Sequence, residues 1–376
     1  MRAVVFASEL PPGPGGIGHH AHHLALQLVD RGWSVTVLAP QDYASDDEIA
    51  EWTALQPYRV ERLRPWPTSV LQALARAARL VTVVRRHRPD LVVASGLRVV
   101  WLCALLVSRL GSPWVAIGHG LEFGVGGWAS RLTRWAFERA RAVVCVSSYT
   151  AERLSAAGIT PRRSEIIRNG ADDQVFRPPT QPVVRGDGPR QLVTVGTVSR
   201  RKGQDLVVRA LPAIVAAGVD VRYSAIGLDR NADDVRRLAE QLGVSERVQL
   251  TGRLDDRQVV ERLGAADLFV LPSRHTAEGD FEGFGIAVVE AALCGTPAVV
   301  TRESGLVEAI ADGDTGLAVP PDDPDALGAA ILELLLDEPR RRRMAERARK
   351  RAVNEQTWQR RGEQYHRLLT EIARPS

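Results

Sequence analysis

Residues 282–297 read EGFGIAVVEAALCGTP, and this stretch gives the clearest indication of the fold. Its glycines allow a close-fitting loop, and the apolar residues that follow predict a helix over Gly285–Leu293. Gly295 predicts the end of that helix. Apolar, β-branched runs flank it at Leu268–Leu271 and Ala298–Thr301, and they predict buried strands. A strand, a glycine loop, a helix and a second strand form the repeating unit of a parallel α/β sheet.

The same alternation continues through the chain and predicts the α/β class, with two doubly wound, Rossmann-like domains. The stretch Arg177–Arg190, with four prolines and two glycines, interrupts the pattern and predicts a linker. We therefore expect one domain over residues 1–180, a second over 181–355, and a C-terminal helix over 356–376 that packs back on the first domain. Two such halves facing each other would form a cleft, where ligands usually bind.

The predicted elements fall into two series, one on each side of the linker. Predicted strands are Arg2–Ala7, Ser34–Leu38, Leu91–Ala94, Trp114–Ile117, Ala142–Val146, Gln191–Val195, Arg222–Ile226, Val248–Thr251, Leu268–Leu271, Ala298–Thr301 and Gly316–Val319. Predicted helices include His19–Asp30, Val70–Arg88, Trp128–Arg139, Ser148–Ala157, Gln204–Ala217, Ala232–Leu242, Asp256–Ala265, Gly285–Leu293, Gly305–Ile310, Pro324–Leu336 and Thr357–Ile372.

Composition excludes several classes of protein. With 376 residues, 45% hydrophobic and 25% charged, the chain is neither disordered nor fibrous. Cys103, Cys145 and Cys294 lie far apart in apolar stretches, which predicts buried thiols in a reducing compartment rather than disulfides. The apolar run Val99–Ser108 is shorter than the roughly 18 residues that span a bilayer. The apolar run at the N-terminus, which ends before Pro11-Pro12, is too short for a signal peptide. We expect a cytoplasmic protein, soluble or peripheral at the inner face of a membrane.

Basic residues are unevenly distributed. Of the 49 lysines and arginines only Lys202 and Lys350 are lysines, so a retained lysine is of interest. Residues 60–141 contain 13 arginines against four acids, a local charge of +9. Basic helices that also carry Trp128 and Trp135 indicate an anionic membrane surface. The alternative is ordinary solvated helices in an arginine-rich sequence. No recognised nucleic-acid-binding module accompanies the charge, so we expect no nucleic-acid partner.

A first glycine loop, Gly13-Pro14-Gly15-Gly16-Ile17-Gly18, has the G-x-G-x-x-G spacing of dinucleotide-binding folds. The insertion Ser8–Pro12 separates it from the preceding strand, which argues against NAD or FAD. Such a loop before a helix predicts an anion site, unless it is only a permissive turn. His19, His20, His22 and His23 follow. They lack the Glu of H-E-x-x-H and a visible third ligand, so polar residues lining the cleft are expected rather than a metal site.

Two carboxylates accompany the loop at 282–297. Glu282 precedes the predicted helix, and Glu290 lies eight residues on, about 12 Å along a helix. This arrangement suits a nucleotide sugar, with its pyrophosphate at the helix N-terminus and hydroxyl groups on the two carboxylates. The alternative interpretation is that Glu282 is a capping acid and Glu290 a solvated helix residue, and the spacing alone leaves both interpretations open.

This segment resembles the E-x7-E motif of the retaining glycosyltransferases of family 4, which have the GT-B fold. Other blocks that resemble the family follow in the same order over residues 3–365. They are Gly15-Gly16-Ile17-Gly18; His119 in GHGLE; Asn169-Gly170-Ala171-Asp172 with Phe176 and Pro178; Gly196 with Lys202-Gly203; Ala266-Asp267-Leu268 through Pro272-Ser273; and Asp312-Gly313-Asp314-Thr315-Gly316. The single D-x-D lies in the last of these, a turn that matches the family's turn, so no metal role is expected for it.

The resemblance implies roles for individual residues. It implies that Glu282 contacts the hydroxyls of the donor sugar, and that Glu290 contacts the ribose. Where the family often has Arg after glycine, this chain has Thr197, so the phosphates would rely on Lys202 and on Arg201. The remaining implied donor-binding groups are the loop at Gly16, His119 near C6 of the sugar, backbone near Leu254 at the base, and the amides of Phe284, Gly285 and Ile286.

The expected reaction is transfer of a hexosyl group, with retention, from a nucleotide-diphosphate-sugar to an acceptor hydroxyl. The resemblance implies that the leaving phosphate helps to deprotonate the acceptor on the same face, unlike the two-carboxylate glycosidases. No metal and no cofactor are expected, the donor being a co-substrate. The acceptor is unidentified: a lipid-linked molecule, a glycan or a small metabolite. Alternatives are another GT-B enzyme, such as a nucleotide-sugar epimerase, or a dinucleotide-binding oxidoreductase.

Overall fold

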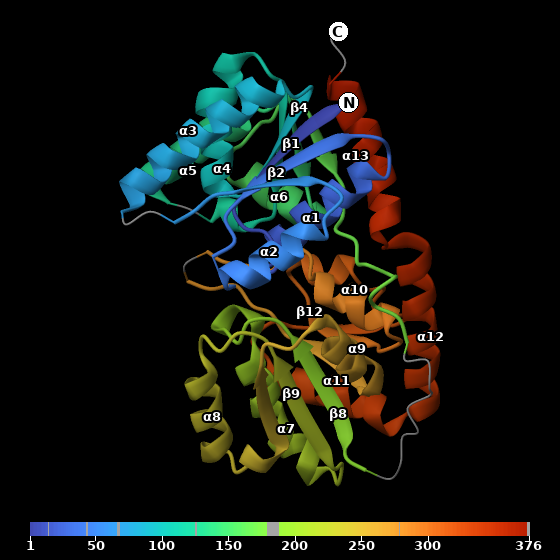
Figure 1. Cartoon of the computed structure of the whole chain (residues 1–376). Coiled ribbons are helices and arrows are strands. Elements are labelled where there is room, and N and C mark those ends of the chain that lie inside the picture. Colours follow the sequence, from blue (N-terminus) through green and yellow to red (C-terminus); the bar gives the residue numbers. More distant parts are fainter. Residues whose placement is uncertain are drawn as a thin grey trace. The chain divides into compact units, whose positions relative to one another are not determined.

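The computed structural model describes residues 1–13, 15–42, 44–65, 68–124, 126–178, 188–277 and 279–373 (Figure 1). It divides into two compact units, Met1–Asn169 with Trp358–Ser376, and Gly170–Thr357. The first unit ends earlier than the boundary at 180 that the sequence suggested. The reason is that Ala171 donates its N–H to the carbonyl of Gln356 at 2.9 Å and forms a bridge with Thr357. Residues 179–187 of the predicted linker lie outside the described residues.

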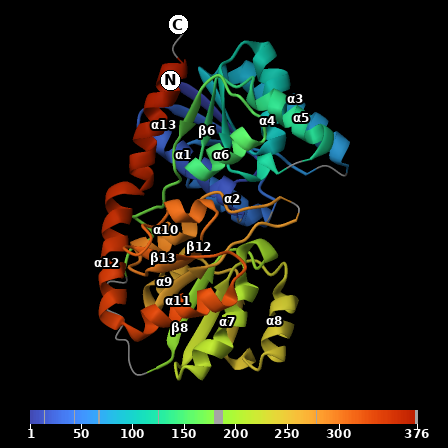
Figure 2. The ribbon, with the colours of Figure 1, turned by 180° about the vertical axis from the view of Figure 1, so that it is seen from behind.

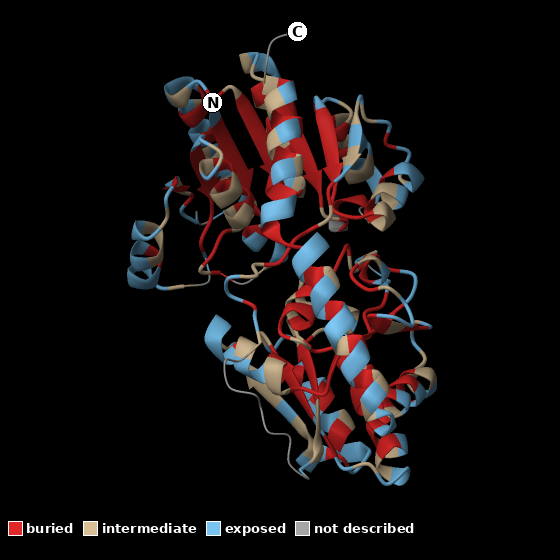
Figure 3. Ribbon diagram, turned by 90° about the vertical axis from the view of Figure 1, so that its right-hand side faces the viewer, coloured by how far each residue is buried: buried red, intermediate tan, exposed pale blue. Residues whose placement is uncertain are grey.

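The first unit is built on a seven-stranded parallel sheet, in the order β3-β2-β1-β4-β5-β6-β7. The central strands are the apolar runs recognised in the sequence, and they are buried on both faces, as parallel strands between helices are (Figure 3). The strands are β1 (Arg2–Ala7), β2 (Ser34–Ala39), β3 (Arg59–Arg62), β4 (Leu91–Ser95), β5 (Trp114–Gly118), β6 (Ala142–Cys145) and β7 (Ser164–Ile166).

Helices cover both faces of this sheet. One face packs on α3, α4 and α5 through Leu80, Val100 and Phe137, among others. On the other side the C-terminal helix α13 packs against α1 (Figures 1 and 2), which places the last helix of the chain in the first unit. The helices are α1 (Gly16–Val29), α2 (Asp46–Ala54), α3 (Ser69–His87), α4 (Leu97–Leu102), α5 (Gly127–Phe137), α6 (Ser148–Ala156) and α13 (Trp358–Ala373).

The second unit contains a six-stranded parallel sheet in the order β10-β9-β8-β11-β12-β13. Both sheets therefore have the strand order of doubly wound Rossmann-type folds. The strands are β8 (Arg190–Val195), β9 (Val221–Ile226), β10 (Val248–Gly252), β11 (Leu268–Leu271), β12 (Ala298–Thr301) and β13 (Gly316–Val319). The helices are α7 (Gln204–Ala216), α8 (Ala232–Gln241), α9 (Asp256–Ala265), α10 (Ile286–Leu293), α11 (Pro324–Leu336) and α12 (Glu338–Glu355).

Each unit has a hydrophobic core of its own. In the second unit α7 packs on α11 (Figure 2), and both contribute to one core with β8, β9 and β11. Cys103, Cys145 and Cys294 are buried and free, as expected. None of the described helices combines the length and the apolar character needed to cross a membrane.

Candidate functional site

The loop after β8 brings two cations to the carboxyl edge of the second sheet. A short 3-10 turn, Arg200–Lys202, follows this strand and leads through Gly203 into α7. The aliphatic part of Lys202 lies against Gly196, where an added Cβ would be only 3.1 Å from the lysine Cε. Packing against a glycine backbone therefore fixes the position from which the ammonium extends.

The loop before α10 brings a carboxylate to the same edge. Gly285 is the N-cap residue of α10, with a φ of 83°, and a Cβ there would come within 2.3 Å of the Leu306 side chain. The carbonyl of Glu282 accepts the N–H of Gly305 at 3.0 Å, which ties the loop to its neighbour. Because no side chain caps α10, the interpretation of Glu282 as a capping acid is wrong. The helix begins at Ile286, one residue later than predicted.

Glu282, Lys202 and Arg201 form one cluster. The Nζ atom of Lys202 is 2.8 Å from Glu282 Oε2, and Arg201 Nη1 donates to the same oxygen at 2.5 Å. The side chains of Lys202 and Glu282 are each 12% exposed, and that of Arg201 is 25% exposed. Burial alone would raise the pKa of Glu282, but the two cations outweigh it and lower that pKa to about 2. Glu282 is therefore a carboxylate throughout the physiological pH range.

The cluster carries more positive than negative charge. Burial lowers the pKa of Lys202 more than the attraction of Glu282 raises it, and the charge of Arg201 lowers it further. The charged form of Glu282 is thus stabilised in this cluster, whereas the charged form of Lys202 is destabilised. The reason is that two cations share one carboxylate with little water around them. An arrangement of this kind favours a further anion beside the two cations.

Glu290 lies on α10 beyond this cluster and is partly buried rather than a solvated helix residue. Burial raises the pKa of Glu290 to about 8, and the carboxylates of Asp256 and Asp172 add to the rise. The side chain is therefore mostly protonated at neutral pH, when it can both donate and accept a hydrogen bond. A protonated carboxyl suits a hydroxyl-bearing partner better than a cation.

Backbone groups at the start of α10 are free to bind a ligand. Within the described part of the chain, the N–H groups of Phe284, Gly285 and Ile286 make no hydrogen bond. Helix N-termini carry partial positive charge as well as unpaired donors, so they attract anions. Leu254 lies in the loop between β10 and α9 and is partly exposed, as a group that contacts a base would have to be.

His119 belongs to the first unit, where it follows β5 at the carboxyl edge of the sheet. Its Nε2 atom is 2.8 Å from Ser95 Oγ, at the end of β4, and its ring lies edge-on to His20 with the centroids 5.0 Å apart. Burial lowers the pKa of His119 to about 3, so the imidazole is neutral at physiological pH. A neutral imidazole can donate a hydrogen bond to a hydroxyl group through one ring nitrogen or accept one through the other.

Glu122 was not recognised as a site residue in the sequence, yet it fixes the loop that carries His119. Its Oε2 atom accepts the N–H groups of His119 and Gly120 at 3.1 and 2.8 Å. The side chain is buried, and burial raises the pKa of Glu122 to about 7. The spacing of three residues after His119 within GHGLE was the available signal for this turn.

The first glycine loop differs from the open anion site that the sequence predicted. The carboxylate of Glu9 accepts the N–H of Gly18 at 3.0 Å, at the start of α1. A Cβ at Gly15 would lie 2.1 Å from Glu9 Oε1, so glycine is required there. The N-terminus of α1 therefore holds a carboxylate of the chain itself, supplied from the inserted segment Ser8–Pro12. Gly16 is exposed at the first position of this helix.

The histidines that follow have roles in packing. His20 is buried, 2.9 Å from the hydroxyl of Tyr365, and His23 stacks on Trp358 with ring centroids 5.3 Å apart. Both aromatic partners come from α13, so these histidines help to dock that helix. No group of three or more His, Cys, Asp or Glu side chains suited to a metal ion occurs among the described residues.

The predicted residues therefore fall into two groups. Lys202, Arg201, Glu282 and Glu290 lie together at the carboxyl edge of the second sheet. His119 and Gly16 lie at the carboxyl edge of the first sheet, in the other unit.

Comparison with known proteins identifies the family. The model for Glycosyl transferases group 1 matches residues 180–351, and that for Glycosyltransferase Family 4 matches residues 14–175. The chain is 31% identical to the GDP-mannose-dependent alpha-(1-6)-phosphatidylinositol monomannoside mannosyltransferase of Mycolicibacterium smegmatis, over 98% of each chain. The chain belongs to the group 1 glycosyltransferases.

Other relatives and solved structures agree. The chain is 29% identical to the glycogen synthase of Mycobacterium tuberculosis, over 96% of this chain and 92% of the relative. The crystal structure of Anabaena HepE in complex with UDP and glucose superposes with a TM-score of 0.84 and 20% identity, over 99% of this chain and 100% of HepE. The predicted GT-B fold is thereby confirmed, and so is an enzyme of the glycosyltransferase class, whereas the alternatives of an epimerase or an oxidoreductase receive no support.

Proposed function

We propose that this glycosyltransferase moves a hexosyl group, with retention of anomeric configuration, from a nucleotide-diphosphate-sugar to a hydroxyl of a lipid-linked acceptor at the inner face of an anionic membrane. The observation that carries the donor side is the cluster of Lys202 and Arg201 around Glu282, with its excess of positive charge. A diphosphate is the natural anion for two cations beside a helix N-terminus with free amides.

The reaction develops negative charge on the departing diphosphate. Lys202, Arg201 and the free N–H groups at the start of α10 are held in place before the reaction, so they stabilise that charge with little rearrangement. Glu282 is ionised and accepts hydrogen bonds from hydroxyls of the donor sugar, while Glu290 binds the ribose. His119, which is neutral, contributes a hydrogen bond to the sugar.

In this proposal the leaving phosphate takes the proton of the acceptor hydroxyl on the face of the sugar from which it departs. Lys202 and Arg201 supply the positive charge that a metal ion provides in other transferases. We therefore propose that no metal or cofactor takes part. The D-x-D residues do not point to a metal either. Asp312 accepts the N–H of Ala318 at 2.8 Å, and Asp314 pairs with Arg347 at 2.5 Å.

The mannosyltransferase relative suggests GDP-mannose as the donor, and the glycogen synthase relative suggests a glucosyl donor as the competing case. The test is a thermal-shift series with GDP-mannose, ADP-glucose and UDP-glucose, followed by rates with the donor that binds. Ligand at 100 times its Kd should stabilise the protein by about 2.7 kcal/mol. A larger shift with GDP-mannose than with the glucosyl donors is expected, and the reverse order would refute this donor. No shift with any nucleotide sugar would contradict the donor site itself.

The acceptor side rests on exposed apolar side chains of two helices in the first unit. Val70 and Leu74 on α3, and Trp128 on α5, are 67%, 62% and 73% exposed. Arginines are exposed on the same two helices and give them positive charge, for example Arg85 on α3 and Arg131 on α5. Apolar side chains with a basic border favour insertion into an anionic lipid surface. This arrangement favours a lipid acceptor over a soluble glycan.

Vesicle sedimentation tests this surface. The protein should sediment with phosphatidylcholine vesicles that contain phosphatidylglycerol and not with phosphatidylcholine alone, and less so as the Debye length falls from about 10 Å at 0.1 M salt to 3 Å at 1 M. Reversing Arg85, Arg86 and Arg131 to Glu should release it and leave donor binding intact. The matched control reverses three exposed arginines of the second unit, Arg209, Arg222 and Arg343. Equal binding of both triple variants would contradict this surface.

A further inference from the structure

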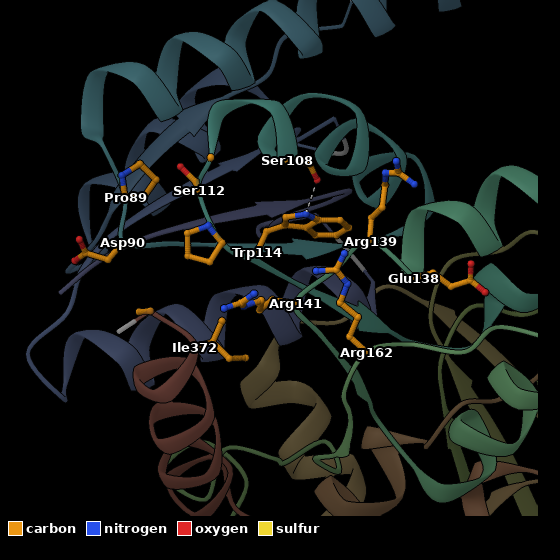
Figure 4. Close-up of a pocket in the computed structure, with 13 residues that line it drawn as sticks. Pro89, Asp90, Ser108, Ser112, Trp114, Glu138, Arg139, Arg141, Arg162 and Ile372 are labelled. Atoms are coloured by element: carbon orange, nitrogen blue, oxygen red, sulfur yellow. Dashed lines mark hydrogen bonds between the residues drawn. The ribbon is translucent and has the colours of Figure 1, made fainter. Parts of the chain in front are cut away.

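A pocket of about 830 Å³ lies in the first unit, away from His119 (Figure 4). Its walls include residues just before or at the start of strands, among them Asp90 before β4, Trp114 in β5, Arg141 before β6 and Arg162 before β7. All strands of this sheet are parallel, so the pocket marks the amino edge of the sheet. His119 follows the other end of β5, about 16 Å from Trp114 at the rise of a strand.

Three arginine side chains bring positive charge to this pocket. Arg139, Arg141 and Arg162 line it, and all three are exposed. In the part of the chain that the structure describes, none of the three forms an ion pair with a carboxylate. The guanidinium of Arg139 lies over the ring of Trp135, 4.4 Å from its centroid, which orients this cation without neutralising it.

Two carboxylates, Asp90 and Glu138, also line the pocket, and each of them accepts a backbone N–H. Asp90 accepts the backbone N–H of Arg2 at 2.8 Å, and Glu138 accepts the N–H of Thr160 at 3.4 Å. The contrast with the next residue along the chain is informative, because Arg163 pairs with both Glu165 and Glu371. Arg162 therefore remains available to a ligand, whereas the next residue, Arg163, is paired with two carboxylates.

The lining also has an apolar part, beside Ser108, Ser112 and the two carboxylates. Pro89, Pro113, Ile372 and the buried ring of Trp114 contribute to the walls, and the Trp114 N–H is already used by Ser108 Oγ at 3.0 Å. Figure 4 shows Arg141 and Arg162 among the residues around the Trp114 ring. Guanidinium groups bind phosphate oxygens in a forked geometry, and an apolar wall accommodates the remainder of a ligand.

We propose that this pocket is a second anion site, which binds the phosphate group of an organic phosphate independently of the transfer reaction. The phosphate lies between the guanidinium groups of Arg141 and Arg162, and its organic part lies against the proline, isoleucine and tryptophan side chains. The ligand is a free phosphorylated metabolite or the phosphate of a lipid headgroup, which share this chemistry.

Calorimetric titration of the full-length protein with sn-glycerol 3-phosphate and with inorganic phosphate tests this site. The double variant Arg141→Ala/Arg162→Ala is compared with Arg209→Ala/Arg222→Ala, which removes the same charge from exposed positions of the second unit. We expect the first variant to bind glycerol 3-phosphate at least about tenfold more weakly, because charge-assisted hydrogen bonds are lost, and the control to bind as wild type does. Phosphate bound at the donor site would be unaffected by either variant.

Vesicles of phosphatidylcholine with phosphatidylglycerol form the second arm and distinguish the two sources. If wild type binds glycerol 3-phosphate and the first variant does not, the ligand is a free metabolite. If wild type binds only the vesicles, and the first variant loses that binding, the ligand is a lipid headgroup. Equal affinities of both variants for every probe would overturn the proposal, and so would no binding by wild type. Inorganic phosphate that binds as tightly as glycerol 3-phosphate would overturn the role of the apolar wall.

Discussion

Replacing Lys202 by methionine separates the contribution of this residue to donor binding from its contribution to stability. Methionine keeps the unbranched shape that packs against Gly196 and removes only the ammonium, which is 2.8 Å from Glu282. The pKa of Lys202 is lowered by burial, so the fold holds its positive charge at a cost. Removal of that charge from the unliganded protein also removes this cost.

The structure sets the expected magnitudes. Removing one partner of an isolated buried pair destabilises a protein by about 3–5 kcal/mol. Here Glu282 keeps Arg201 as a partner, and the burial cost of the ammonium disappears, so we expect the free energy of unfolding to change by no more than about 1 kcal/mol. Binding of a nucleoside diphosphate loses a charge-assisted hydrogen bond, about 1.5–3 kcal/mol, which weakens its Kd roughly 10- to 150-fold.

Two measurements decide the matter: urea unfolding followed by tryptophan fluorescence, and calorimetric titration with the nucleoside diphosphate of the preferred donor. Lys350→Met, which changes the exposed lysine of α12, is the matched control and should alter neither quantity. Arg201→Met should weaken binding less than Lys202→Met, because Arg201 is the more exposed of the two cations. Unchanged affinity together with a loss of more than about 3 kcal/mol of stability would show a purely structural lysine.

Three further changes test other parts of the two sites. The pKa of Glu290 is raised to about 8 in the fold from 4.5, so wild type should lose stability as the pH rises from about 5 to 8. Glu290→Gln should abolish this dependence and gain on the order of 5 kcal/mol at pH 9, measured by urea unfolding. Glu122→Ala should lower the free energy of unfolding by about 1–3 kcal/mol and lower the transfer rate, because the N–H groups of His119 and Gly120 lose their acceptor. Glu122→Gln should restore most of the stability and most of the rate. Equal rates in the two variants would contradict a positioning role. Transfer should continue in EDTA, and inactivation reversed by a divalent cation would contradict metal-independent chemistry.

Much of the fold was predictable because both sheets consist mainly of parallel strands that are buried on two faces. Such strands are short apolar runs, so β8 to β13 were recognised to within one residue at their ends. The strands that were not predicted, β3 with sequence RVER and β7 with SEI, lie at the two edges of the first sheet. An edge strand has one neighbour and more exposed side chains, so its composition gives little hydrophobic pattern.

The candidate site was predictable where a residue acts through its position in a motif, as for Lys202, Glu282 and Glu290. Contacts between segments distant in sequence were not predictable. Arg201 reaches Glu282 across 81 positions of the chain, and Tyr365 reaches His20 across 345. Glu122 and Ser95 support His119 by short-range geometry that depends on where β4 and β5 end. The contact with Ser95 is not encoded in the spacing of residue types, whereas the three-residue spacing from His119 to Glu122 was an available signal.

The two units use the same element, a glycine loop before a helix, with opposite electrostatic outcomes. In the first unit the N-terminus of α1 is already satisfied by the carboxylate of Glu9, and burial raises the pKa of that group. In the second unit the first N–H groups of α10 have no acceptor among the described residues, and Lys202 and Arg201 add positive charge nearby. An incoming diphosphate would meet a carboxylate at α1 and free donors at α10. Charge therefore favours the second unit for the phosphates of the proposed donor, although the glycine pattern of the first is closer to a dinucleotide motif.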